Sequence, residues 1–247
     1  MRVEIIAVLI LLAIPLAAAA LDQSYVHVVA RDGTSTMEKS MELAVFSNQL
    51  TSDALEKMAV LCKSDRDLDC DVDVANKKVA IREKLSPGAY YSFSSDYGLP
   101  DITHTLVINS IPSDRFAADL DDLLVGAGVT ESSGGSVDSI DLRDKTANNK
   151  SVYYLKLLKV NITYTVTMPL DIAEARAGDV AGEISGNSAT FDLVKVMEES
   201  EPITVRCTEL NLGYMVGIAG IAVIAVLAFL FLSGRKPEAE KPQKKRK

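Results

Sequence analysis

The longest apolar run in the chain lies near its C-terminus. Residues 212–232 carry no charged side chain. A helix of this length crosses a hydrocarbon core of about 30 Å. We therefore predict a transmembrane helix over residues 211–232, with the lipid bilayer as its partner.

A second apolar run stands at the N-terminus. Residues 5–16 follow Arg2 and lead into Ala18 and Ala20, the small-residue pattern that a signal peptidase accepts. We predict a signal peptide over residues 1–20. An uncleaved membrane anchor is the alternative, which the shortness of the run disfavours.

Between these two runs, alternating apolar residues and β-branched residues predict a series of strands. The predicted strands cover residues 25–30, 41–46, 68–74, 79–85, 90–93, 102–111, 137–142, 152–167, 189–196 and 203–208. Residues 127–150 are rich in Ser, Gly, Asp and Asn, which predicts a long exposed connection. If the region holds two subdomains, they divide within this connection.

Two segments show helical spacing instead. Residues 53–62 place their apolar side chains on one stripe, and a second segment carries Phe116, Leu120 and Leu124 at four-residue intervals. Gly126 is a natural stop for the second helix. Because strands and helices do not alternate regularly, we predict an α+β fold with a mainly antiparallel sheet and two short helices.

The distribution of charge sets the expected orientation. Residues 233–247 hold seven basic and two acidic side chains, and basic segments stay on the cytoplasmic side of a membrane. We predict a type I protein of the cell membrane, with an extracellular domain over residues 21–210 and a cytoplasmic tail over residues 233–247. Residues 21–211 hold 18 basic and 31 acidic side chains, a net charge of −13, which argues against a nucleic acid partner.

One stretch resembles a known family. Residues 164–169 read Tyr-Thr-Val-Thr-Met-Pro, Gly178 follows, and residues 186–193 read Gly-Asn-Ser-Ala-Thr-Phe-Asp-Leu. This resembles the C-terminal signature of the LppM-like domain family of bacterial and archaeal membrane-anchored surface proteins. The resemblance implies a curved antiparallel sheet with helices and an apolar cavity, similar to lipid-binding folds and linked to envelope glycolipids.

The chain departs from this family pattern in three ways. Leu170 stands where a glycine often follows the proline, and Phe191 replaces a usual tryptophan. The lipid-anchoring cysteine of the lipoprotein members is also missing, so the mode of anchoring differs.

Three cysteines are expected to enter an oxidising compartment. Cys62 and Cys70 would close a small loop between the first predicted helix and the next strand, so we predict a disulfide between them. Cys207, near the membrane end of the last predicted strand, is expected to be a buried thiol. A disulfide to a second chain is the alternative for Cys207.

Alternating aspartates at positions 65, 67, 69, 71 and 73 invite a calcium hypothesis. Read as an EF-hand loop from Asp65, however, the run places Cys70 at the glycine position and Asn76 at the glutamate position, so the motif fails. We expect these acids to line the exposed face of a strand. The histidines are His27 and His104, and His104 is expected in the core or in a cavity wall. No metal ion or cofactor is predicted.

Three further motifs concern modification and assembly. Asn149 and Asn161 each begin an N-glycosylation sequon. Asn149 falls in the predicted connection and is the better site, whereas Asn161 falls in a predicted strand and must face solvent there. Gly213 and Gly217 stand four residues apart in the predicted transmembrane helix, a spacing that lets two helices approach closely. It predicts a weak homodimer.

The sequence shows no catalytic signature. The patterns G-x-S-x-G, H-E-x-x-H and the P-loop do not occur, so we do not expect an enzyme. With the resemblance, this favours a membrane-anchored module that binds a lipid, glycolipid or glycan, with Phe116, Leu120 and Leu124 as candidate wall residues. Ordinary core packing is the alternative for these three. The rival function is a structural or adhesion-type surface protein that binds another protein.

Overall fold

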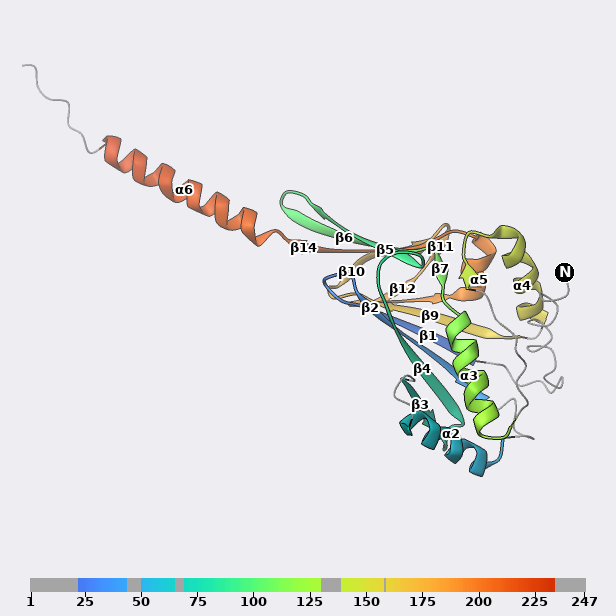
Figure 1. The fold of residues 1–247 in the computed structure, drawn as a ribbon. Helices are drawn as coiled ribbons and strands as arrows, with labels where there is room; N and C mark the ends of the chain where they lie inside the picture. Colours follow the sequence, from blue (N-terminus) through green and yellow to red (C-terminus); the bar gives the residue numbers. More distant parts are fainter. Residues whose placement is uncertain (1–21, 44–49, 65–68, 130–138, 158, 234–247) are drawn as a thin grey trace, which may run out of the picture. The chain divides into compact units, whose positions relative to one another are not determined.

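The computed structural model describes residues 22–43, 50–64, 69–129, 139–157 and 159–233 (Figure 1). These residues form two units. The described residues up to Ser95, together with those of Thr103–Thr208, form the first unit, and Asp96–Ile102 with the residues from Glu209 onward form the second. The predicted signal peptide lies outside the described residues.

The largest sheet of the first unit has seven strands in the order β12-β13-β9-β1-β2-β4-β3. Its strands are β1 (Asp22–Val29), β2 (Ser35–Glu42), β3 (Cys70–Asp73), β4 (Lys78–Leu85), β9 (Asn161–Thr167), β12 (Glu183–Ser185) and β13 (Ser188–Asp192). Neighbouring strands are antiparallel, except that β1 and β9 run parallel. The sheet is therefore mixed, with one parallel pair at its centre.

A second sheet has the strand order β11-β10-β14-β6-β5. Its strands are β5 (Tyr91–Tyr97), β6 (Asp101–Ile108), β10 (Ile172–Ala177), β11 (Val180–Ala181) and β14 (Ile203–Leu210), and a separate pair is formed by β7 (Ser110–Ile111) and β8 (Ile140–Asp141). Strand β10 runs antiparallel to both β11 and β14. The predicted α+β class with mostly antiparallel sheets is confirmed.

The prediction of two short helices is inexact, because five helices occur in the described part of the chain. They are α2 (Ser52–Ser64), α3 (Asp114–Gly126), α4 (Lys145–Leu157), α5 (Leu193–Glu199) and α6 (Leu212–Ser233). Helices α2 and α3 are the two that the sequence predicted, and α3 ends at Gly126 as expected. Helix α6 matches the predicted apolar span.

The strand predicted over residues 152–167 is wrong in its first half, where the chain continues α4. Asn148 and Val152 are buried, and Leu155 packs against the core. These residues share one face of a helix, because they are four and three positions apart. The β-rich composition of the segment hides this spacing, and β9 begins only at Asn161.

The strand predicted over residues 189–196 is likewise cut short. The side chain of Asp192 accepts hydrogen bonds from the backbone N–H groups of Val194 at 3.1 Å and Lys195 at 3.4 Å. An aspartate in this position caps a helix by satisfying donors that have no partner within the helix. Helix α5 therefore begins immediately after Asp192.

Two apolar clusters make up the core of the first unit. The larger cluster lies among the strands of both sheets and includes Tyr91, Tyr164 and Phe191. The smaller cluster joins α2 and α3 to β4 through residues such as Leu55, Met58, Val79 and Leu123. Helices α2 and α3 thus cover their own core beside β4 (Figure 1).

A disulfide joins α2 to β3. It links Cys62 to Cys70, whose Cα atoms lie 5.5 Å apart. Cys62 is buried in the smaller cluster, so the bond ties the apolar side of α2 to the edge of the seven-stranded sheet. Cys207 lies elsewhere, on β14, and is fully buried.

Candidate functional site

The candidate ligand-wall residues lie on α3, and the two whose side chains are described pack against the core. Leu124 is buried in the smaller cluster, and Leu120 packs against both clusters. The side chain of Phe116 lies outside the described residues. The two described side chains are thus occupied by contacts with the protein's own core, which was the alternative to a ligand-binding role.

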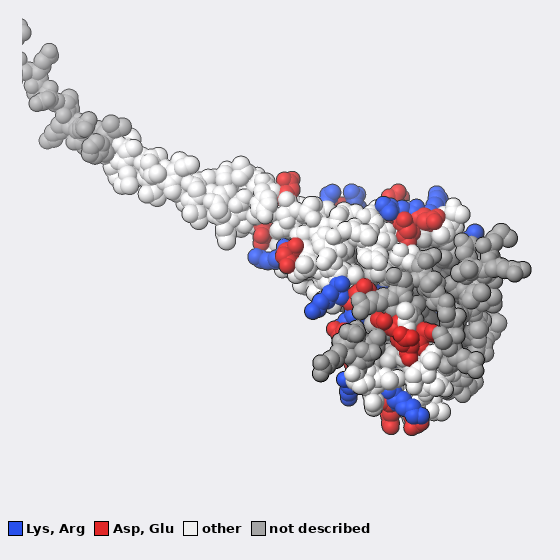
Figure 2. Space-filling model, in the orientation of Figure 1, with Lys and Arg blue, Asp and Glu red and all other residues white. Residues whose placement is uncertain are grey.

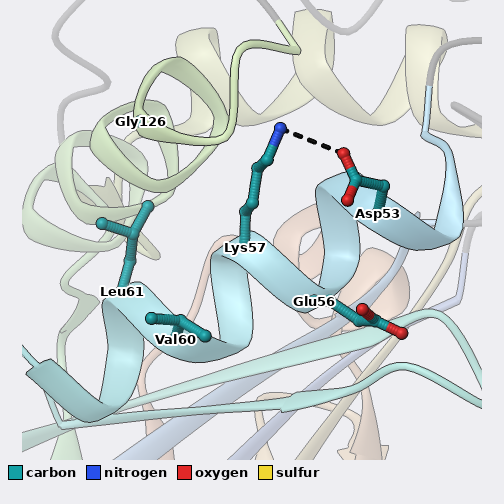
Figure 3. A pocket seen from close by; sticks show the side chains of 6 residues that line it. All are labelled: Asp53, Glu56, Lys57, Val60, Leu61 and Gly126. Carbon is teal, nitrogen blue, oxygen red and sulfur yellow. Dashed lines mark ion pairs between the residues drawn. The ribbon is translucent and has the colours of Figure 1, made fainter.

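A shallow cleft lies between α2 and α3, next to these residues (Figure 3). It has a volume of about 340 Å³ and is lined by Asp53, Glu56, Lys57, Val60, Leu61 and Gly126. Lys57 Nζ forms an ion pair with Asp53 Oδ2 at 3.0 Å across one side of the cleft. Three of the six lining residues are charged, and the cleft is open to solvent rather than enclosed like a pocket that buries most of a ligand.

A hydrogen-bonded cluster of histidine, tyrosine and serine side chains is buried in the first unit. His27 is 0% exposed, and its Nδ1 lies 2.8 Å from the Tyr164 hydroxyl while its Nε2 lies 2.7 Å from Ser35 Oγ. Ser35 donates to the Tyr91 hydroxyl at 3.1 Å, which donates to the Gly33 carbonyl at 2.7 Å. The cluster connects β1, β2 and β9 of one sheet to β5 of the other.

The hydrogen bonds of His27 indicate its tautomer. Because the Ser35 hydroxyl donates to Tyr91, its oxygen accepts a hydrogen bond from the Nε2–H of His27. Nδ1 faces the Tyr164 hydroxyl, which donates to it when the imidazole is neutral. Burial lowers the pKa of His27 from 6.5 to about 4 and raises that of Tyr164 well above 10.0.

Burial also determines whether a substrate can reach this cluster. Tyr91, Tyr164 and His27 have no exposed surface, so a substrate cannot reach a ring nitrogen or a hydroxyl without opening the core. A fully satisfied buried network of this kind fixes the packing of the two sheets on each other. The contacts described for this cluster are therefore contacts between strands of the two sheets.

The outer side of α4 carries an exposed apolar face. Tyr153 is 65% exposed and Leu157 is 64% exposed, and Tyr154 beside them is also exposed. The rings of Tyr153 and Tyr154 meet edge to face, with centroids 5.4 Å apart. We call Tyr153, Tyr154 and Leu157 the α4 outer face.

The inner side of α4 holds this face in place. Asn148 Nδ2 donates to the Leu142 carbonyl at 3.0 Å, and Val152 is buried in the larger cluster. Lys156 forms an ion pair with Glu198 of α5. The α4 outer face is therefore presented by a helix whose opposite side is packed.

Comparisons with known proteins add no relatives. The chain matches no protein-family profile, no curated protein and no solved structure. The resemblance to the LppM-like family thus rests on the sequence motif alone.

The two sequons lie on regular elements. Asn149 is exposed on α4 rather than in the predicted connection, four residues before Tyr153 and so beside it on the helix surface. Asn161 is the first residue of β9, opposite Asp22, and is exposed. A glycan on Asn149 would cover part of the α4 outer face.

The acidic run contributes to an exposed strand. Asp71 and Asp73 of β3 are exposed, and Val72 between them is half-buried. Asp65 and Asp67 lie outside the described residues. Within the described residues, no three His, Cys, Asp or Glu side chains come together in a way that could hold a metal ion.

His104 lies on β6 and is half-buried. Its Nδ1 is 2.8 Å from Ser95 Oγ, and its ring stacks on Phe93 with centroids 5.9 Å apart. Both contacts join β6 to β5. His104 was expected in the core or in a cavity wall, and the structure places it at a half-buried position between two strands.

Helix α6 dominates the second unit. It contains 22 residues, and its segment Leu212–Leu230 is long and apolar enough to cross a membrane. The most apolar part of this segment is not buried inside the protein. Figure 2 shows the helix as a surface without blue or red. A Cβ built on Gly217 meets no described atom within 4 Å, so the face of Gly213 and Gly217 is open to a second helix.

Proposed function

We propose that this chain is a single-pass type I membrane protein whose extracytoplasmic domain binds another protein and performs no catalysis. In this proposal α6 is the anchor and the α4 outer face is the binding surface. The observation that carries the proposal is the pair of exposed tyrosines with an exposed leucine on a helix whose other side is packed into the core.

The anchor is supported by length, composition and exposure. At about 1.5 Å per residue, a helix of the length of α6 covers a hydrocarbon core of about 30 Å. Its apolar side chains, including Phe229 and Leu227, are exposed along the described helix. A bilayer removes this surface from water. The basic residues that follow α6 favour the cytoplasm for the tail.

Binding at the surface is supported by how the first unit uses its apolar side chains. Leu120 and Leu124 pack into the core, whereas Tyr153 and Leu157 face solvent. Tyrosine is enriched at protein interfaces because it combines a large apolar ring with a polar tip. The nearby ion pair of Lys156 and Glu198 supplies a polar rim. An exposed apolar face on a helix whose other side is packed favours a protein partner.

A site-specific crosslinking experiment tests the proposal in native membranes. A photoreactive amino acid replaces Leu157 in the full chain, and Val60 of α2 is the matched control because both side chains are 64% exposed. We expect one protein adduct of defined mass from position 157, lost when Tyr153→Ala is added. Absence of an adduct at position 157, or the same adducts from both positions, would contradict the proposed surface.

The lipid hypothesis has a separate readout. Native mass spectrometry of the full chain, extracted gently from its own membrane, shows whether one lipid stays bound after the annular lipids are removed. We expect no such lipid. A lipid retained at one copy per chain would favour a lipid-binding module instead.

A further inference from the structure

The turn between β5 and β6 belongs to the same unit as the start of α6. Asn211 joins the two: its backbone N–H donates to the Pro100 carbonyl at 2.9 Å, and its Nδ2 donates to the Gly98 carbonyl at 3.4 Å. Asn211 also caps α6, because its Oδ1 accepts from the Tyr214 N–H at 3.1 Å. One residue thus holds Asp96–Ile102, the β5–β6 turn, against the first turn of α6.

Apolar side chains project from this turn. Tyr97 is 73% exposed and Leu99 is 67% exposed, and Leu210 and Leu212 at the start of α6 are exposed as well. Single exposed apolar residues are common on soluble proteins. Here, however, Leu210 and Leu212 stand at the start of an apolar span, and Asn211 bonds the turn that carries Tyr97 and Leu99 to this point.

We propose that Tyr97 and Leu99 insert into the interfacial layer of the membrane leaflet that α6 enters. This inference rests on the proposed role of α6 as the anchor. If Leu212 begins the span, Asn211 lies at the boundary between headgroups and hydrocarbon. The turn that is bonded to Asn211 then lies at the same depth. Tyrosine rings favour this layer, where one end of the ring is apolar and the other is wet.

The charges of the turn indicate which lipids it accepts. Asp96 and Asp101 flank the apolar tip, and the turn contains no Lys or Arg. Attraction to the membrane is therefore hydrophobic, and acidic headgroups would repel the two carboxylates. We expect the tip to enter zwitterionic membranes and to enter anionic ones less deeply.

The absence of tryptophan from the sequence makes fluorescence a direct test. The full chain carrying Tyr97→Trp is reconstituted into phosphatidylcholine vesicles whose acyl chains carry bromine near the headgroups, which quenches nearby indoles. Tyr153→Trp is the matched control, because Tyr153 is 65% exposed and lies on the first unit. We expect quenching at least about twofold stronger at position 97 than at position 153, because only an interfacial side chain reaches the bromines.

A third variant separates this inference from the function it rests on. Phe229→Trp reports on α6 itself and should be quenched in the same vesicles, because it lies near the far end of the span, close to the headgroups of the other leaflet. Quenching at 229 with position 97 no more quenched than position 153 would overturn the insertion of the turn while the anchor stands. Absence of quenching at 229 would overturn both. Adding Leu99→Asp to Tyr97→Trp should reduce the quenching at position 97, and an unchanged value would also count against insertion.

Discussion

At the scale of single residues, the neutral His27 makes the first unit sensitive to acid. Its pKa is lowered to about 4 in the folded state, against an ordinary value of 6.5. The unfolded chain therefore binds one more proton between these values, and the free energy of unfolding falls as the pH drops through this window. The contribution is fully present above pH 6.5 and is lost as the pH approaches about 4.

We expect His27→Gln to reduce this acid sensitivity. Between about pH 7.5 and 4.5, the wild type should lose about 2.5 kcal/mol more stability than the variant. Urea unfolding of the full chain in detergent at both pH values measures the difference. The variant itself should be less stable at pH 7.5, because it alters the bonds to Tyr164 and Ser35. Equal losses in both proteins would show that His27 is not the group responsible.

Some contacts between residues could be predicted from the sequence, and others could not. The pairing of Cys62 with Cys70 could be predicted because the two lie close in sequence, and the joining of their sulfurs requires only a local loop. The cluster around His27 could not, because His27 and Tyr164 are 137 positions apart. Only the sheet order, which places β1 beside β9, brings them together.

At the scale of elements, Gly182 marks a close approach between β12 and the core. A Cβ at this position would meet three ring atoms of Phe191 at 2.7, 2.9 and 3.1 Å. The Phe191 ring is buried and cannot move freely. We expect Gly182→Ala to lower the free energy of unfolding by about 1–3 kcal/mol, as overpacked cores do.

Gly126→Ala is the control for this prediction. The added Cβ would also meet an atom at 2.7 Å, but that atom is a terminal methyl of the half-buried Leu61, which can rotate away. Alanine also favours a helix more than glycine does. Thermal unfolding should show a lower midpoint for Gly182→Ala alone. A similar drop of the midpoint in both variants would mean that the closeness of the added Cβ, and not the rigidity of the neighbouring side chain, determines the loss of stability.

The disulfide stabilises the contact of α2 with β3. Because the cysteines are eight positions apart, opening the loop with Cys62→Ala and Cys70→Ala should cost about 2.5 kcal/mol through the entropy of the unfolded chain. Denaturant unfolding measures this loss, and the rate of amide hydrogen exchange should increase most in α2. Wild type with its disulfide reduced should behave like the variant. A variant as stable as the wild type would contradict the predicted contribution of the disulfide.

The spacing of apolar residues predicted the elements in which that spacing follows either the helical or the strand repeat throughout. Helix α2 and the β3–β4 hairpin fall in this group. Strand β2 does not, because Ser35 and Lys39 share its buried face with methionines. Helix α4 was missed because valine and tyrosine favour strands locally, while packing of Asn148 and Val152 decides for a helix. The α4 outer face, the main part of the proposed site, was missed for the same reason.

At the scale of the whole molecule, the open face of α6 predicts self-association. Gly213 and Gly217 leave room for a second helix to approach. We expect Gly217→Leu to reduce crosslinked dimer in membranes several-fold, because the side chain would hold the helices apart. Ala222→Leu is the comparison, since nine residues of helix place Ala222 on the side opposite Gly213. Unchanged dimer in Gly217→Leu would exclude this face as the contact.

The orientation of the chain decides whether the α4 outer face can meet a partner outside the cell. A basic tail after α6 predicts that the first unit is outside and the C-terminus inside. Tyr153→Cys and Gln243→Cys test this with a membrane-impermeant maleimide on intact cells. Cys207 is buried and Cys62 is bonded to Cys70, so the wild type sets a low background. We expect labelling at position 153 at once and at position 243 only after permeabilisation. The reverse pattern would place the α4 outer face in the cytoplasm, where its partner would have to be sought.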